Sequence, residues 1–134
     1  MAERDLGVLL SSMAAHCDGL EWVFCMVDAL PSGVEPAVVV REDEGITVVV
    51  TRTQADELGL AYDYVAARLT LRVHSALDAV GLTAAVSGAL ASAGISANVV
   101  AGFFHDHVYV PFVRRDEALA VLSSLSSQAA RAPR

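Results

Sequence analysis

The sequence has no lysine, few cysteines and no apolar run of membrane-spanning length. All nine basic residues of the 134-residue chain are arginines, a usage that by itself indicates no function. The two cysteines, Cys17 and Cys25, form no CxxC pair and are typical of reduced thiols in the cytosol. No apolar run reaches the roughly 18 residues of a membrane span, and residues 1–5 lack the pattern of a signal peptide. We therefore expect a cytoplasmic protein.

Basic patches are also missing. The net charge is −7, with twelve acids against three arginines in residues 1–65 and four acids against six arginines in residues 66–134. Neither half offers the basic stripe that phosphate backbones or anionic lipid surfaces attract. Nucleic acid and membranes are therefore not expected as partners.

The sequence contains none of the common catalytic motifs. There is no G-x-S-x-G elbow, no P-loop and no dinucleotide fingerprint. A catalytic Cys–His pair that uses Cys17 or Cys25 is an alternative, but no spacing in the sequence favours it. We expect no enzyme and no cofactor.

Hydrophobic residues make up 54% of the chain, enough for one well-buried domain or two small ones. In the first half the patterns predict a helix over 5–13, a loop over 14–20, a buried strand over 22–27 and a β-hairpin of strands 37–41 and 46–51. A short helix follows to about Gly59, with Thr53 as its cap.

The second half alternates in the same way. We predict a strand over 68–74, a helix over 82–93, strands over 95–103 and 107–112, and a helix over 115–125. The halves repeat weakly, which indicates two small α/β units over 1–65 and 66–126 and a flexible tail over 127–134. Strands 22–27 and 37–40 would leave exposed edges, so we expect a homodimer or a larger assembly.

The stretch from His74 to Thr83 reads as a loop between a strand and a helix start. Its one charged residue is Asp78, and Gly81 closes it. A loop that leads into a helix collects backbone N–H groups without partners, which suits a carboxylate.

Three segments carry a resemblance to a known family: His74–Thr83, Ile95–Ala101 and His105–Pro111. Together they resemble the ACT domain, and more narrowly a bacterial family of small paired ACT proteins. The Asp106-His107 motif is also similar to one in eukaryotic cytosolic amino-acid sensors. The resemblance implies an α+β fold of two ferredoxin-like (βαββαβ-type) units with antiparallel sheets, and a regulatory protein that binds a free amino acid where ACT units meet.

By position, the resemblance assigns ligand binding to the loop after the strand and to a polar residue on the next strand. Backbone N–H groups near 80–82 would take the carboxylate, and Asp78 or Asn98 would take polar groups of the ligand. The first half lacks such a loop, which makes a second site doubtful. The expected ligand-binding residues are Ser75, Leu77, Asp78, Ala79, Val80, Gly81, Leu82, Thr83, Asn98 and Val99.

Other interpretations remain. Asp78 could instead cap the helix, and His74 could be structural. The His105-Asp106-His107 triplet could hold a metal in a small enzyme, but Asp is a common turn residue and no further ligands are marked, so we expect no metal. The main alternative to amino-acid binding is a structural module that pairs through sheet edges. An unidentified protein partner would receive the signal.

Overall fold

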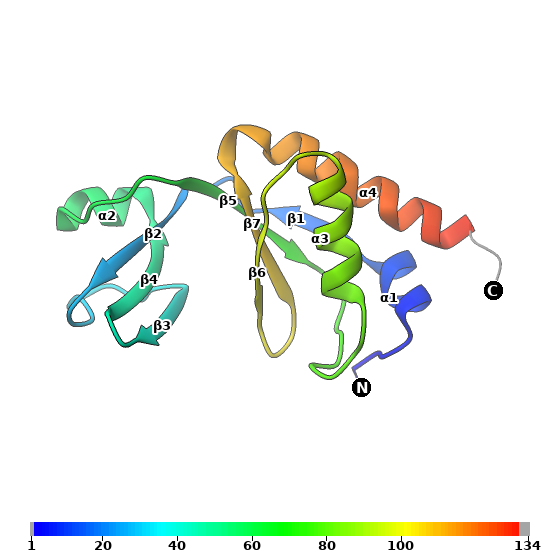
Figure 1. Ribbon diagram of the computed structural model, residues 1–134, viewed down its shortest axis with the longest axis horizontal. Helices are drawn as coiled ribbons and strands as arrows, with labels where there is room; N and C mark the ends of the chain where they lie inside the picture. The colour runs from blue at the N-terminus through cyan, green and yellow to red at the C-terminus, as the bar shows by residue number, and fades with distance from the viewer. Residues whose placement is uncertain (1, 132–134) are drawn as a thin grey trace.

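Strand β5 (Val65–Leu71) runs through the middle of the molecule and belongs to both of its lobes (Figure 1). The computed structural model describes residues 2–131. Along one edge of β5, Val65 and Ala66 pair with β2, and Leu69–Leu71 pair with β1 (Ala15–Cys17). Its other edge pairs with β7 (Asp106–Pro111). All strand pairs within the described residues are antiparallel and form one continuous sheet.

The first lobe holds β2 (Trp22–Val27), β3 (Val38–Glu42), β4 (Gly45–Thr51), α2 (Arg52–Leu58) and the start of β5. Its strands lie in the order β3-β4-β2-β5. This is the order of a ferredoxin-like sheet whose fourth strand lies beside its first. The helix that should join the first two strands is missing, and residues 28–37, which include two prolines and a glycine, form a loop instead.

The second lobe has the same strand order, but one of its strands comes from the beginning of the chain. It holds β5, α3 (Leu82–Ser92), β6 (Asn98–Ala101), β7, a 3₁₀ turn (Phe112–Arg114) and α4 (Arg115–Arg131). Its order is β1-β5-β7-β6. The fourth strand is therefore β1, which comes from the beginning of the chain, and α1 (Leu6–Ser12) packs against α4 beside it.

The prediction of a loop over 14–20 is therefore wrong for residues 15–17. Three residues with one polar side chain show no clear alternation, and only the ladder with β5 makes them a strand. The boundary between two units at residue 65 stays a prediction. Residues 6–17 pack with the second lobe and complete its sheet and core.

The helices lie on one face of the sheet. Ala67, Leu69 and Leu71 point from β5 into the core under α1, α3 and α4, and Val65, on the same face, packs into the core under α2. In a strand, alternate residues share a face. The fully buried members of the larger core are Leu9, Ala67, Leu69, Val86, Leu90, Val108, Val110, Ala118 and Leu122.

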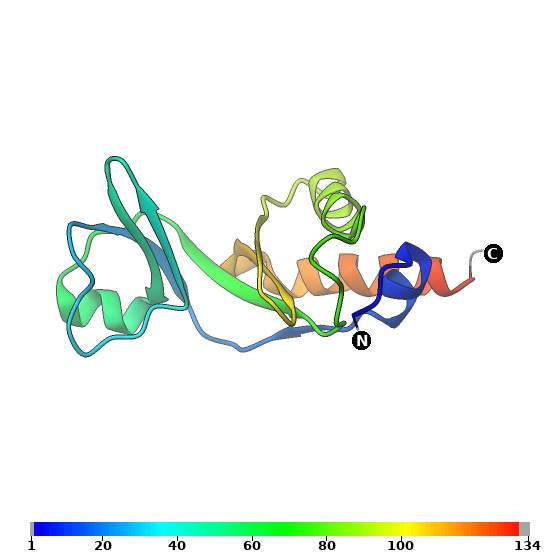
Figure 2. The same ribbon diagram turned by 90° about the horizontal axis from the view of Figure 1, so that it is seen from below.

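The opposite face carries no helix and holds an aromatic cluster where the lobes meet. Phe24 and Tyr109 contact edge to face with ring centroids 5.4 Å apart. The Arg68 guanidinium lies 4.2 Å from the ring centroid of Trp22 and forms an ion pair with Asp18 at 3.1 Å. The lobes, which extend end to end in Figure 2, are thus held together by side chains as well as by β5.

Several predicted boundaries shift. The helix predicted over 115–125 continues to Arg131, so residues 127–131 of the predicted tail are helical. The rest of that tail, 132–134, lies outside the described residues. The Ser126 hydroxyl, which donates to the Met13 carbonyl at 3.2 Å, fixes this part of α4 to the chain start. The α2 cap is Thr51 rather than Thr53: its Oγ1 accepts from the Gln54 amide, and the Gln54 side chain accepts from the Thr51 amide.

Candidate functional site

The loop between β5 and α3 lies at the end of the sheet where β7 begins. The strand register places Asp106 opposite Leu71 on β5 and opposite Ala101 on β6. Asp106 and the loop together line a small cavity of about 60 Å³. The lining residues are Ser75, Ala76, Leu77, Ala79, Leu82, Thr83, Ala101 and Asp106.

Helix α3 begins at this cavity without a side-chain cap. Its N-cap residue, Gly81, has a φ of 103°, and no side chain accepts a hydrogen bond there. The first backbone N–H groups of a helix have no partner within the helix. Two residues of this first turn, Leu82 and Thr83, line the cavity. The helix start therefore offers free donors and a positive dipole end to an anion.

Asp106 faces the same cavity and is the one buried charged residue in the core of the described chain, with 8% of its surface exposed. Its carboxylate forms no hydrogen bond with another group in residues 2–131, but it is not a fully buried, unpartnered group as Tyr64 Oη and His105 Nδ1 are. Burial raises the pKa of Asp106, an effect that the nearby His107 and His105 partly oppose. A carboxylate with little access to water favours a cationic partner, and an ammonium group in the cavity would supply one.

The expectation that Asp106 is a turn residue is wrong. The turn spans 102–105, and β7 already begins at Asp106. The alternation of Val108 and Val110 could have identified it, because extending that period by one step places residue 106 on the same buried face.

Residues near the chain start hold the loop from outside. The Glu3 amide donates to the His74 carbonyl and the Ala76 amide donates to the Glu3 carbonyl, both at 2.9 Å. Arg4 forms a bidentate ion pair with Asp78, with Nε–Oδ1 at 3.1 Å and Nη2–Oδ2 at 3.3 Å. The side chain of Asp78 is 73% exposed and points to Arg4, and it does not cap α3.

The structure brings together some of the expected ligand residues. Ser75, Leu77, Ala79, Leu82 and Thr83 line the small cavity. Asp78 lines a second, outer cavity of about 340 Å³ with Arg4 and Phe103. Val80 belongs to the loop, but it is 84% exposed and lines neither cavity.

Asn98 and Val99 are not near this loop in the same chain. Asn98 lies opposite Tyr109, three positions along β7 from Asp106, and on the helix-free face. Val99 packs against the core under the helices. The register therefore separates both residues from the loop.

The His105-Asp106-His107 triplet diverges because neighbouring side chains on a strand point to opposite faces. His107 Nδ1 lies 3.0 Å from the Thr70 hydroxyl on the helix-free face, whereas Asp106 faces the helices. Burial lowers the pKa of His107. Within residues 2–131, no three His, Cys, Asp or Glu side chains gather as metal ligands would. The His74 ring lies beside the Phe104 ring, with centroids 5.6 Å apart and the planes tilted by 46°.

Two lobes with ferredoxin-like strand order define a small α+β fold of paired units. Residues 1–67 match one model described as ACT domain, and residues 67–124 match another. The chain belongs to the ACT-domain family.

Solved structures support this assignment. A Vibrio cholerae protein of unknown function, described as a possible transport protein, is 40% identical, covering 90% of this chain and 95% of its own, with a TM-score of 0.82. An Agrobacterium tumefaciens protein is 17% identical over 85% of this chain and 89% of its own, with a TM-score of 0.72.

The ligand-free regulatory subunit of aspartate kinase from Thermus thermophilus shares the fold. It is 11% identical over 83% of this chain and 95% of its own, with a TM-score of 0.63. None of the curated proteins matches this chain. No helix within residues 2–131 is both long and apolar enough to cross a membrane.

Proposed function

We propose that this protein binds a free amino acid between the start of α3 and Asp106. The observation that carries the proposal is that one cavity has both an uncapped helix N-terminus and the carboxylate of Asp106, a residue only 8% exposed. An α-amino acid has a carboxylate and an ammonium group on one carbon. The free N–H groups of Leu82 and Thr83 would take the carboxylate, and Asp106 would take the ammonium group.

The cavity would hold only the charged head of the ligand. Its volume of about 60 Å³ is far below the roughly 300–1,000 Å³ of common ligand pockets. The ligand side chain would then extend past the loop, where Leu77 is 67% exposed and Val80 84% exposed. Apolar residues in this position would be covered by a second copy of the chain. We therefore propose a homodimer in which the ligand lies at an ACT interface.

The proposed role is regulatory, cytoplasmic and without catalysis. ACT domains are regulatory modules, and one structural neighbour is a regulatory subunit. The binding protein would report amino-acid supply to a protein partner or through its own assembly. We propose one site per chain, because the first lobe has no helix between β2 and β3 and so lacks a second uncapped helix start.

The test is a thermal-shift screen of the twenty amino acids on the parent protein and on Asp106→Asn. The variant keeps the shape of the side chain and removes its charge. A hydrogen bond to a charged group contributes roughly 1.5–3 kcal/mol, so the ligand found with the parent should bind about ten- to a hundredfold more weakly. The control is Glu44→Gln in the exposed β3–β4 turn, which should bind like the parent.

Two results would contradict the proposal. If no amino acid raises the melting temperature of the parent, the structural-module interpretation gains support. If a ligand is found and calorimetry gives equal affinity for Asp106→Asn, the site lies elsewhere. Asp78→Asn then tests the outer cavity, where Asp78 and Arg4 are the charged groups.

A further inference from the structure

The outer cavity adjoins the small inner cavity along the loop after β5. Residues 75–77 line both cavities. Another wall comes from the turn between β6 and β7: Ala101 and Asp106, on either side of this turn, line the inner cavity, and Phe103 within the turn lines the outer one. The same two segments therefore enclose both cavities. A ligand whose charged head occupies the inner cavity can extend into the outer one.

The outer cavity has room for a large side chain. Its volume of about 340 Å³ lies within the roughly 300–1,000 Å³ of common ligand pockets, whereas the inner cavity has only about 60 Å³. The two cavities thus divide an amino acid between them, with its head in the inner cavity and its side chain in the outer one.

Large apolar side chains line the outer cavity and have little cover of their own. Leu77 is 67% exposed and Phe103 is 71% exposed. The Phe103 ring contacts Phe104 edge to face, with centroids 5.1 Å apart, and Phe104 in turn lies beside His74, which also lines the cavity. An apolar group of a ligand would remove part of this surface from water, which is favourable.

The two charged residues of the outer cavity neutralise each other. Arg4 Nε and Nη2 bind the two carboxylate oxygens of Asp78, so neither charge is left over for a ligand. A charged ligand side chain would have to displace one member of this ion pair, and it would gain only what the pair loses. The cavity therefore favours an uncharged side chain.

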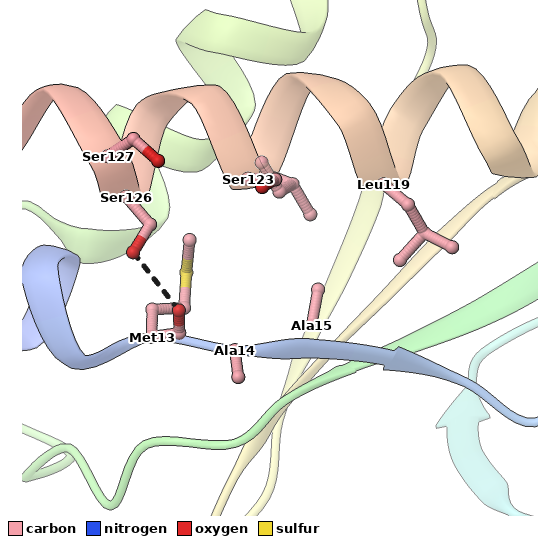
Figure 3. Close-up of a pocket in the computed structure, with 8 residues that line it drawn as sticks. Met13, Ala14, Ala15, Leu119, Ser123, Ser126 and Ser127 are labelled. Atoms are coloured by element: carbon pink, nitrogen blue, oxygen red, sulfur yellow. Dashed lines mark hydrogen bonds between the residues drawn. The ribbon is translucent and has the colours of Figure 1, made fainter.

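The groove between β1 and α4 is a different kind of space. It has about 390 Å³, and Figure 3 shows Met13, Ala14 and Ala15 on one side of it and Leu119 with three serines on the other. None of its eight lining residues is charged, so it has no partner for the head of an amino acid. It also lies beside the edge of β5 that faces away from β7 and Asp106.

We propose that the ligand is an amino acid with a large apolar side chain, such as leucine, methionine or phenylalanine, and that this side chain lies in the outer cavity against Leu77 and Phe103. The inference rests on the proposed function, because the head of the ligand must occupy the inner cavity. It adds the class of amino acid that the protein distinguishes from the others.

The test is calorimetry on the full-length protein with a homologous series: alanine, 2-aminobutyrate, norvaline and norleucine. These ligands share one head, and each added methylene that is buried should strengthen binding about fourfold. Lysine has the norleucine side chain with an ammonium group at its end. It should bind about tenfold or more weakly than norleucine, because its charge finds no free partner.

Two variants locate the side chain of the ligand. Phe103→Ser removes apolar wall, so it should weaken norleucine binding about tenfold and leave alanine binding unchanged. Val113→Ser is the matched control: Val113 is 86% exposed, follows the other end of β7 and lines neither cavity. Arg4→Gln leaves Asp78 without its partner, and the affinity for lysine relative to norleucine should then rise.

The outcomes separate this inference from the proposed function. If no amino acid binds, or if Asp106→Asn has no effect on the affinity, the proposed function fails and the inference fails with it. If binding requires Asp106 but the affinity is constant along the series, or lysine binds as tightly as norleucine, only the inference is overturned. Equal loss of alanine and norleucine binding in Phe103→Ser would also overturn it, because Phe103 would then support the head of the ligand.

Discussion

Phe24 from the first lobe contacts Tyr109 from the second, with the two rings at 80° to one another. Tyr109 is 1% exposed although it lies on the helix-free face of the sheet, because Phe24 and its neighbours cover it. The lobes thus share a small aromatic core in addition to β5.

We expect this pair to couple the stability of the two lobes. Phe24→Leu and Tyr109→Leu should each destabilise the protein, and the double variant should show a coupling of about 0.5–1.5 kcal/mol in urea unfolding. Tyr109→Leu combined with Phe104→Leu is the control, because Phe104 is 63% exposed at a hairpin tip and in contact with Phe103. Additive effects for Phe24 and Tyr109 would show that the contact carries no coupling.

The buried Asp106 should make the stability of the ligand-free protein depend on pH. Its folded pKa lies above its ordinary value of 3.8, so as the pH rises the unfolded chain releases this proton first. The contribution of Asp106 to stability therefore falls between these two pKa values and stays low above the folded one. Asp106→Asn has no carboxyl group to ionise and so lacks this loss. In urea unfolding, the free energy of unfolding of the variant should therefore rise relative to that of the parent between pH 4 and pH 7. A difference that is constant with pH would contradict the assigned burial effect.

Two glycines of α3 should respond in opposite directions to the same substitution. Gly81 has a φ of 103° and its added Cβ would lie 3.0 Å from Leu6 Cδ2, so Gly81→Ala should cost about 1–2 kcal/mol. Gly88 lies within the helix with no atom within 4 Å of an added Cβ, so Gly88→Ala should stabilise by about 0.5–1 kcal/mol. Chemical denaturation measures both, and equal signs would refute the assignment of strain to Gly81.

The capping box of α2 gives a sharp test of two threonines in one segment. Thr51→Ala removes the oxygen that accepts from the Gln54 amide and should cost about 1 kcal/mol. Thr53→Ala is the matched control inside the helix, and should change stability by less than about 0.5 kcal/mol. If Thr53→Ala is the more damaging change, the helix begins two residues later than described.

Local patterns in the sequence were enough to predict most elements. The β-branched runs around residues 38–51 predicted the hairpin of the first lobe, and the period of Leu82, Val86 and Leu90 predicted α3. The loop from 75 to 83 and its free helix start could also be predicted, since both depend on residues adjacent in the chain. The family resemblance supplied the strand order, which local patterns do not contain.

Tertiary structure decided the features that depend on residues far apart in the chain. β1 is a strand because β5, more than fifty residues later, pairs with it. Asn98 is separated from the loop by the register of β6 on β7, which composition does not determine. Asp106 faces the start of α3 because β5 and β6 end, and β7 begins, at the same end of the sheet. The sequence by itself determined a loop suited to an anion, and only packing across the sheet placed a carboxylate opposite it.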